Sequence, residues 1–397
     1  MRNKILSERA AWFTQADEAK AKGVYPYFKE IESEQDAEVI YKGKKVLMFG
    51  SNSYLGLTNH PKLKEASIEA IKKYGSGCAG SRFLNGTLDI HVHLEKELAE
   101  FVGKEEALVF STGFQVNMGV IPALTGREDY VIFDELDHAS IMTGKQLSYS
   151  HTLKFKHNDM ESLEKVLSRC DYDKIKLIVV DGVFSMEGDV VNLPEIVRLA
   201  HKYNASIYVD EAHSLGVFGN QGRGLCNHFG LTDDVDLIMG TFSKSLASIG
   251  GFIAGDHSVI NLLRHTSRSY IFSASATPSA TASVLAALEI MKTEPERIQH
   301  LWDLTNYALK GFRELGFEIG HTQTPIIPLF IRDNDKTFML TKMLLDEGVF
   351  TNPVVSPAVP SNDTLIRFSL MATHTFEQVD TAIAKIAACS RQLGIIS

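Results

Sequence analysis

Cysteine pairs, long apolar runs and an excess of basic residues are all missing from this chain of 397 residues. The four cysteines are widely spaced and form no C-x-x-C pair, so the sequence indicates neither a disulfide framework nor a zinc site. No apolar run approaches the roughly 18 residues of a membrane-spanning helix. The first 25 residues carry charges throughout and lack the apolar core of a signal peptide. We therefore expect a soluble protein in a reducing cytoplasm.

The charge balance is acidic, with 40 Lys and Arg against 49 Asp and Glu and a formal net charge of −9. A nucleic-acid-binding protein would present a basic face, so no nucleic-acid partner is expected. With 44% hydrophobic and 22% charged residues, the composition is that of an ordinary globular protein. The length is sufficient for one large domain with a sizeable core and a second, smaller domain.

The stretch from residue 206 to residue 255 brings together Asp210, His213 and Lys244. Residues 206–209 form a short β-branched and aromatic run, which predicts a buried strand that ends at Asp210. A second apolar run, residues 235–239, precedes Lys244 in the same way. Ligands of open α/β sheets bind at the carboxyl ends of strands, so we expect the carboxylate and the amine to face one crevice.

Pyridoxal phosphate is the cofactor whose chemistry needs these residue types. A lysine forms a Schiff base with its aldehyde, and an aspartate keeps its pyridine nitrogen protonated. His213 is placed to hydrogen-bond the phenolic oxygen of the ring, and Thr241 and Ser243 offer hydroxyls to the phosphate. The D-E-A-H letters also occur in helicases, but a helicase requires the phosphate-binding motif G-x-x-x-x-G-K-[ST], which the sequence lacks.

Two further strand ends carry candidate cofactor contacts. The predicted strand 107–110 runs into S-T-G-F and an apolar helix, and such a helix N-terminus binds anions through its free N–H groups and its dipole. Gly113 and Phe114 are therefore candidates for a phosphate cup, with an ordinary strand–helix turn as the alternative. His138 follows the predicted strand 130–133, where a lone histidine is more commonly a helix cap.

A glycine pattern upstream imitates a dinucleotide-binding motif. Gly75, Gly77 and Gly80 match G-x-G-x-x-G. A true motif of this kind follows a strand and opens a helix, whereas here a predicted helix, residues 60–74, comes first. We interpret the segment as a loop near the site.

Regular alternation of strands and helices predicts a mostly parallel, doubly wound α/β sheet. We expect three parts: an arm at residues 1–49, a large cofactor-binding domain at residues 50–292, and a small α+β domain at residues 293–397. Within the arm, residues 4–22 read as one amphipathic helix, and residues 39–49 as a hairpin.

Arg367 stands out in the small domain because it lies in an apolar predicted strand, residues 365–370. A buried charge is unfavourable unless it is paired. A bidentate contact with a substrate carboxylate would satisfy it, and a structural salt bridge is the alternative.

Several segments resemble those of the α-oxoamine synthase family, whose members are pyridoxal-phosphate enzymes of fold type I. The resemblance runs from about Phe49 to the C-terminus. The segments that carry it are MFGSNSYLGL, GSGCAGSRFLNGT, STGFQVN, DELDHAS, DGVFSMEGD, DEAHSLGVFGNQGRG, GTFSKSLASIGGFIAG and IRFSLMATHT. The resemblance implies an aspartate aminotransferase-like α/β fold with a mostly parallel, seven-stranded sheet. It also implies a homodimer with shared active sites, in which the arm packs on the partner subunit.

The resemblance assigns roles to individual residues. His138 would stack on the pyridine face, Ser185 would contact the cofactor, and the segment around Ser273 would reach the neighbouring subunit's phosphate. The implied catalytic residues are Lys244, His138, Asp210 and His213. The cofactor-binding residues from the pattern and the resemblance together are Gly113, Phe114, His138, Ser185, Asp210, His213, Thr241, Ser243, Lys244, Ser273, Ala274 and Thr277. The implied substrate-binding residues are Arg367, Asn52, Ser81 and His138.

The family condenses an amino acid with an acyl-CoA. The whole run is most similar to members that use L-serine and palmitoyl-CoA, a long-chain acyl-CoA, and give 3-oxosphinganine, CoA and carbon dioxide. Sister reactions, such as glycine with acetyl-CoA or alanine with pimeloyl-CoA, would use the same catalytic residues and stay open. A non-catalytic subunit of the same fold would be expected to lack Lys244. A peripheral contact with the inner membrane face also stays open, because long-chain acyl groups partition there.

Overall fold

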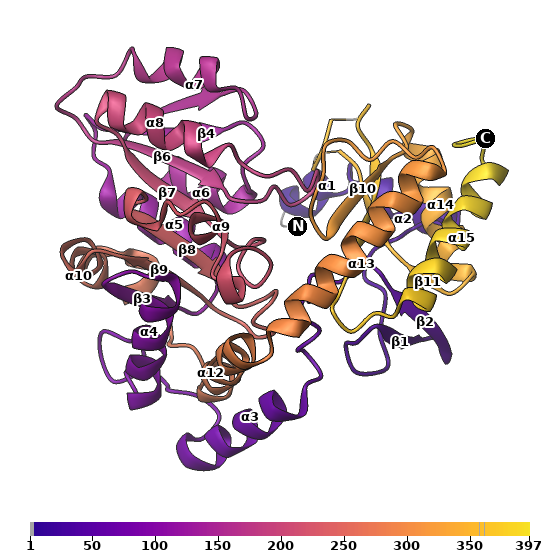
Figure 1. Ribbon diagram of the computed structural model, residues 1–397, viewed down its shortest axis with the longest axis horizontal. Helices are drawn as coiled ribbons and strands as arrows, with labels where there is room; N and C mark the ends of the chain where they lie inside the picture. The colour runs from indigo at the N-terminus through magenta and orange to yellow at the C-terminus, as the bar shows by residue number, and fades with distance from the viewer. Residues whose placement is uncertain (1–3, 357, 361) are drawn as a thin grey trace.

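The structure is a computed structural model that describes residues 4–356, 358–360 and 362–397 (Figure 1). A large α/β part and a smaller α+β part lie side by side, joined by the long helix α13 (Pro295–Glu314). No helix in the described ranges is long and apolar enough to cross a membrane.

The large part is built on one seven-stranded sheet with the order β3-β9-β8-β7-β6-β4-β5. Its strands are β3 (Glu106–Phe110), β4 (Tyr130–Asp134), β5 (His151–Phe155), β6 (Lys176–Asp181), β7 (Ser206–Asp210), β8 (Leu237–Thr241) and β9 (Gly251–Gly255). All neighbours pair in parallel except β9, which is antiparallel to both β3 and β8. The predicted fold class, a mostly parallel seven-stranded α/β sheet, is confirmed.

Helices cover both faces of this sheet, which explains why its central strands read as continuous apolar runs. One face packs against α4, α7, α8 and α12, and the other against α5, α6 and α10, each with its own hydrophobic core. The α-helices of the large part are α3 (Pro61–Tyr74), α4 (Asp89–Val102), α5 (Gly113–Leu124), α6 (Ala139–Leu147), α7 (Met160–Leu167), α8 (Leu193–Tyr203), α9 (Leu225–His228), α10 (His257–Thr266), α11 (Arg268–Ile271) and α12 (Pro278–Thr293).

The small part holds two three-stranded sheets. One has the antiparallel order β10-β13-β12, and the other joins β1 and β2 to β11. The bounds are β1 (Glu38–Tyr41), β2 (Lys44–Met48), β10 (Ile326–Phe330), α14 (Asn334–Asp346), β11 (Val349–Phe350), β12 (Asn352–Val354), β13 (Leu365–Ser369) and α15 (Phe376–Gln392). Because β2 pairs with β11, the predicted hairpin of the arm is attached to the C-terminal part of its own chain. The domain boundaries at residues 49/50 and 292/293 remain our proposal.

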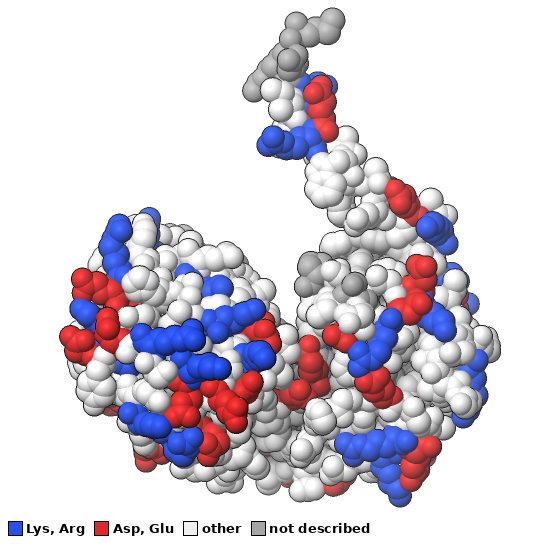
Figure 2. Space-filling view, turned by 90° about the horizontal axis from the view of Figure 1, so that it is seen from above, with Lys and Arg blue, Asp and Glu red and all other residues white. Residues whose placement is uncertain are grey.

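The single helix predicted at residues 4–22 is wrong. The chain forms two short helices, α1 (Ile5–Ala10) and α2 (Gln15–Ala21), and neither buries a residue. Trp12 and Phe13 lie between them and are exposed. Figure 2 shows the segment projecting from the body. Without a surface to cover, the apolar side has nothing that would hold the aromatic pair in helical conformation, because short helices depend on tertiary packing.

Candidate active site

A cavity of about 400 Å³ lies where the two parts of the molecule meet. Its walls combine strand ends of the large sheet with the β12 and β13 region of the small part. The residues lining it are Tyr27, Asn52, His138, Ser185, Met186, His213, Lys244, Asn352, Pro353, Val354, Val355, Ser356, Ala358 and Arg367. Six of the residues predicted from the sequence thus share one cavity, although the sequence separates them by up to 315 positions, from Asn52 to Arg367.

Asp210 is the last residue of β7, as predicted, and only 3% of it is exposed. The side-chain amide of Asn117 donates to its Oδ2 at 2.8 Å, and the Ala212 N–H donates to its Oδ1 at 3.0 Å. The Tyr208 hydroxyl in turn donates to Asn117 Oδ1. These bonds fix the orientation of the buried carboxylate. Asn117 was not among the residues predicted from the sequence, although a polar residue inside the apolar helix α5 was a usable signal.

Lys244 follows β8 and lines the cavity. Burial lowers the pKa of its amine to about 8, while the charges of Asp210 and Asp181 act in the opposite direction. A lysine with this pKa is partly neutral near physiological pH, which is the form that acts as nucleophile and as general base.

His138 caps α6, with its Nδ1 3.2 Å from the Ser140 N–H, and it also lines the cavity. His138 is therefore both a helix cap, the alternative considered from the sequence, and a residue of the cavity wall. The His138 backbone N–H donates to Asp181 Oδ2 at 2.7 Å, which fixes the residue against the neighbouring strand β6. Burial lowers the pKa of its imidazole, so the ring is neutral near pH 7.

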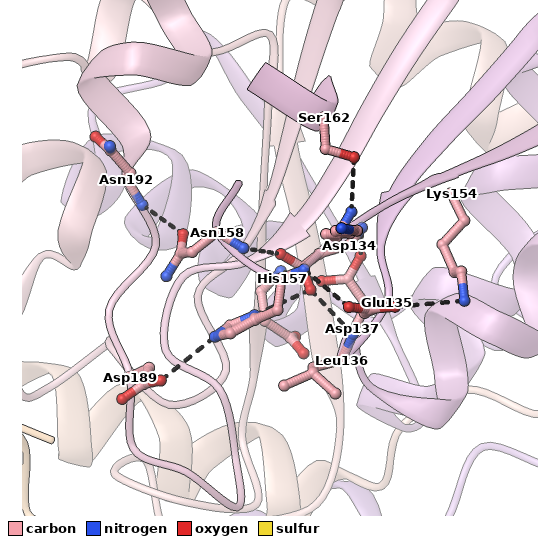
Figure 3. Close-up of polar contacts among 12 residues, drawn as sticks. Asp134, Glu135, Leu136, Asp137, Lys154, His157, Asn158, Ser162, Asp189 and Asn192 are labelled. Atoms are coloured by element: carbon pink, nitrogen blue, oxygen red, sulfur yellow. Dashed lines mark hydrogen bonds and ion pairs between the residues drawn. The ribbon is translucent and has the colours of Figure 1, made fainter. Parts of the chain in front are cut away.

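A polar network of buried and half-buried side chains supports the loop that carries His138 (Figure 3). Asp137 accepts from the backbone N–H groups of Asp134 and Asp181, both at 2.9 Å. His157 bridges Asp134 Oδ1 at 3.0 Å and Asp189 Oδ2 at 3.3 Å. Because Asp189 belongs to the segment that also carries Ser185, the imidazole ties two loops of the site together.

The His157 bridge makes stability depend on pH. Burial alone would lower the pKa of His157, but hydrogen bonds to Asp134 and Asp189 and their charges raise it to about 9. A raised pKa means that this stabilisation is fully present below the unfolded value of about 6.5 and is lost as pH rises through 9. We expect the wild type to lose up to about 3 kcal/mol more than His157→Gln between pH 6 and pH 9.5.

Urea unfolding at the two pH values measures this difference, with exposed His321→Gln as the matched control. Equal losses of unfolding free energy in the wild type and His157→Gln would contradict the bridge.

Arg367 lies in β13 and is 5% exposed. Its Nε donates to the Ser185 carbonyl and its Nη1 to Ser369 Oγ, both at 2.6 Å, and its Nη2 donates to the Tyr54 hydroxyl at 3.3 Å. None of the ion pairs among the described residues includes Arg367, so the structural salt bridge considered from the sequence is absent there. The guanidinium thus keeps donors and an uncompensated charge at the cavity wall, as a carboxylate-binding group requires.

The N-terminus of α5 has the form of a phosphate cup. Gly113 opens the helix, and a Cβ there would come within 2.5 Å of Thr241 Oγ1. Thr241 Oγ1 lies 3.0 Å from Ser243 Oγ, so the hydroxyls predicted to bind phosphate adjoin the helix end. The buried oxygens Asn52 Oδ1 and Gln115 Oε1 have no hydrogen-bond partner among the described residues. Free helix N–H groups and clustered hydroxyls can donate hydrogen bonds to the phosphate of pyridoxal phosphate, whereas the two amide oxygens can accept hydrogen bonds only from donors of the ligands.

Other predicted residues lie around this cup or outside it. Phe114, the second residue of α5, is partly exposed. Ser273 accepts from Gln115 Nε2 at 3.1 Å, and the Ala274 carbonyl accepts from the Ser111 hydroxyl, so both adjoin α5 of their own chain. Thr277 caps α12. Ser81 is buried, and it is not among the residues that line the cavity. The roles predicted for these residues stay proposals.

This sheet, with an aspartate and a lysine at neighbouring strand ends beside a phosphate cup, defines a pyridoxal-phosphate-dependent enzyme of fold type I. The model of the aminotransferase class I and II family matches residues 44–386. The serine palmitoyltransferase of Bacteroides ovatus is 65% identical over 392 residues, which cover 99% of this chain and 100% of that protein. The chain belongs to the serine palmitoyltransferase family.

Two further comparisons agree with this assignment. The structure of a serine palmitoyltransferase variant from S. paucimobilis, with a bound PLP–myriocin aldimine, superposes with a TM-score of 0.96 at 36% identity. The comparison covers 100% of both chains. The 8-amino-7-oxononanoate synthase of Symbiobacterium thermophilum, a sister enzyme, is 46% identical over 95% of this chain and 96% of its own length. The identity is therefore higher to the serine palmitoyltransferase of Bacteroides ovatus than to this sister enzyme.

Proposed function

We propose that the protein condenses L-serine with palmitoyl-CoA, a long-chain acyl-CoA, to give 3-oxosphinganine, CoA and carbon dioxide. It is an acyltransferase of sphingolipid synthesis that uses pyridoxal phosphate. The identity of 65% to the serine palmitoyltransferase of Bacteroides ovatus supports these substrates. The cavity supports amino-acid chemistry, because it combines Lys244, with its lowered pKa, and Arg367, a buried cation that forms no ion pair with any acidic residue among the described residues. The pair offers a base and a carboxylate-binding group to an amino acid.

The residues of the cavity divide the work. When bound, pyridoxal phosphate supplies an electron sink for the negative charge that develops at the α-carbon of the amino acid. Arg367 binds the substrate carboxylate through its remaining N–H donors, with Asn52 and Ser81 as helpers. Lys244, partly neutral at physiological pH, removes the α-proton. Asp210 holds a proton at the ring nitrogen of the cofactor through its fixed negative charge.

Two histidines, Ser185 and the phosphate cup contact the other parts of the cofactor and the substrate. His138 covers the face of the cofactor ring and donates to the substrate carboxylate or the thioester oxygen, while His213 donates to the phenolic oxygen. Ser185 adds a cofactor contact from the loop that Arg367 also binds. The α5 N-terminus with Gly113 and Phe114, together with Thr241 and Ser243, holds the phosphate.

A homodimer with shared sites is part of the proposal. Phe83, Leu84 and Phe272 are large apolar side chains that are 51%, 77% and 78% exposed. Aromatic side chains are enriched at protein interfaces, and Phe272 directly precedes Ser273 and Ala274. In the proposed dimer this segment and Thr277 complete the partner's phosphate site. The proposed location is the cytoplasm, with a peripheral contact at the inner membrane face, where long-chain acyl groups partition.

An absorbance titration of the purified enzyme, loaded with pyridoxal phosphate, tests the proposal. We expect L-serine to shift the visible cofactor band at concentrations about fivefold lower than glycine or alanine, because a hydrogen bond of the serine hydroxyl contributes about 1 kcal/mol. Palmitoyl-CoA should then release thiol faster than acetyl-CoA or pimeloyl-CoA. A preference for glycine or alanine would contradict the serine assignment and indicate that the protein catalyses a sister reaction. Sedimentation of the same sample as a 44.0 kDa monomer would contradict the shared sites.

A further inference from the structure

Tyr54 is a buried residue that touches two groups of the site without lining the cavity. It is 0% exposed, and its hydroxyl lies 2.6 Å from His213 Nδ1 and 3.3 Å from Arg367 Nη2. Its backbone carbonyl accepts from the Ala372 N–H at 2.7 Å, so the small part of the molecule fixes its position. The hydroxyl therefore bridges a predicted cofactor contact and the predicted carboxylate-binding residue.

The chemistry of the three groups sets the direction of these hydrogen bonds. A guanidinium only donates, so the Tyr54 oxygen accepts from Arg367. The Tyr54 hydrogen then has one partner among the described residues, His213 Nδ1, and the opposite arrangement would bury a hydroxyl hydrogen without an acceptor. His213 is accordingly neutral, with its proton on Nε2. Burial and the charge of Lys244 lower the pKa of His213 in agreement with this form.

We propose that Tyr54 is a positioning residue that couples the carboxylate subsite at Arg367 to the tautomer of His213. Its hydroxyl holds His213 with Nε2–H as the donor available to the cofactor. A carboxylate that binds Arg367 offsets part of the guanidinium charge and thereby changes the acidity of the Tyr54 hydroxyl. The inference rests on the proposed function only for the identity of the carboxylate, which is that of the amino-acid substrate.

Removal of one oxygen atom isolates this role, because Tyr54→Phe keeps the ring that packs in the core. Tyr130→Phe is the matched control. The Tyr130 hydroxyl contacts Asp171 at 3.2 Å at the N-terminal end of β4, whereas the site lies at the C-terminal ends of the strands. Both variants are compared with the wild type in the holoenzyme. The ligands are L-serine and L-serine methyl ester, which lacks the charged carboxylate.

In Tyr54→Phe we expect the dissociation constant of L-serine, measured from the cofactor band, to rise about tenfold, while that of the ester changes less than about twofold. Tyr130→Phe should leave both constants as in the wild type. Equal ratios of ester to serine constants in Tyr54→Phe and the wild type would overturn the coupling. If serine causes no band shift even in the wild type, the proposed substrate fails, and the measurement below still decides the hydrogen-bond direction.

A second measurement depends on neither the cofactor nor the folding of a Tyr54 variant. Nitrogen-15 NMR of histidine-labelled wild-type protein without cofactor, with His213→Asn to identify the signal, reports the tautomer at pH 7. We expect the Nε2–H tautomer with Nδ1 as a hydrogen-bond acceptor. A proton on Nδ1 would overturn the proposed relay, whatever the enzyme's substrate.

Discussion

Replacement of Lys244 by alanine is expected to lower turnover of L-serine and palmitoyl-CoA by at least about 10⁴-fold. The variant loses both the amine that binds the cofactor and the base that removes the α-proton, and a positioned base alone contributes about 10²–10⁴-fold. The fold should persist, because alanine is smaller and removes a charged group that burial disfavours. The rate at which the CoA thiol is released from palmitoyl-CoA measures the loss of turnover.

The control for this variant is Lys202→Ala, which removes an exposed lysine of α8 that pairs with Glu164 at 2.6 Å. It should keep wild-type turnover. Circular dichroism and thermal unfolding confirm that both proteins are folded. Undiminished turnover in Lys244→Ala would refute the role of this residue and, with it, the proposed mechanism.

The substitution Asp210→Asn is expected to lower turnover by about 10²–10³-fold, the usual effect of removing a preorganised electrostatic group. The amide has the shape of the carboxylate but no negative charge, so it cannot hold a proton at the ring nitrogen. Asn117 also loses an acceptor for its amide, unless the new side chain turns its oxygen toward it. Binding of the cofactor should persist through the phosphate cup.

The matched change is Asp233→Asn, at an exposed position of the same charge type. Turnover, and the pH dependence of the cofactor band, should change in Asp210→Asn alone. Equal band profiles in the two variants would show that the charge of Asp210 does not act on the ring.

Local patterns were sufficient for the elements that bury an apolar face. The predicted strand 107–110 and the predicted helix 60–74 correspond to β3 and α3, because burial on both faces of a strand or along one side of a helix imposes a periodic apolar pattern. Asp210 and Lys244 were placed correctly at strand ends for the same reason. Helix 4–22 failed because a period predicts a helix only where a surface exists to bury its apolar side.

Contacts between distant segments were beyond a local pattern. Tyr54 and Arg367 are separated by 313 positions, and the pairing of β2 with β11 joins similarly remote parts of the chain. The sequence around Tyr54 does not indicate that its hydroxyl bridges His213 and Arg367, because a tyrosine in an apolar segment predicts only a core residue. Only the closure of the small part on the large sheet brings these groups together.

The late position of the antiparallel strand β9 in the sequence delays the assembly of the large sheet during synthesis. Strand β3 precedes the cup at the start of α5, yet its partner in the sheet is residues 251–255. At a synthesis rate of about 5–20 residues per second, β3 waits on the order of 10 s for that partner to leave the ribosome. During this time its apolar run has an unpaired edge, which favours aggregation of incomplete chains. The sheet that carries the cofactor site can therefore be completed only after residue 255 has been synthesised, and chains truncated before β9 should emerge as cofactor-free protein.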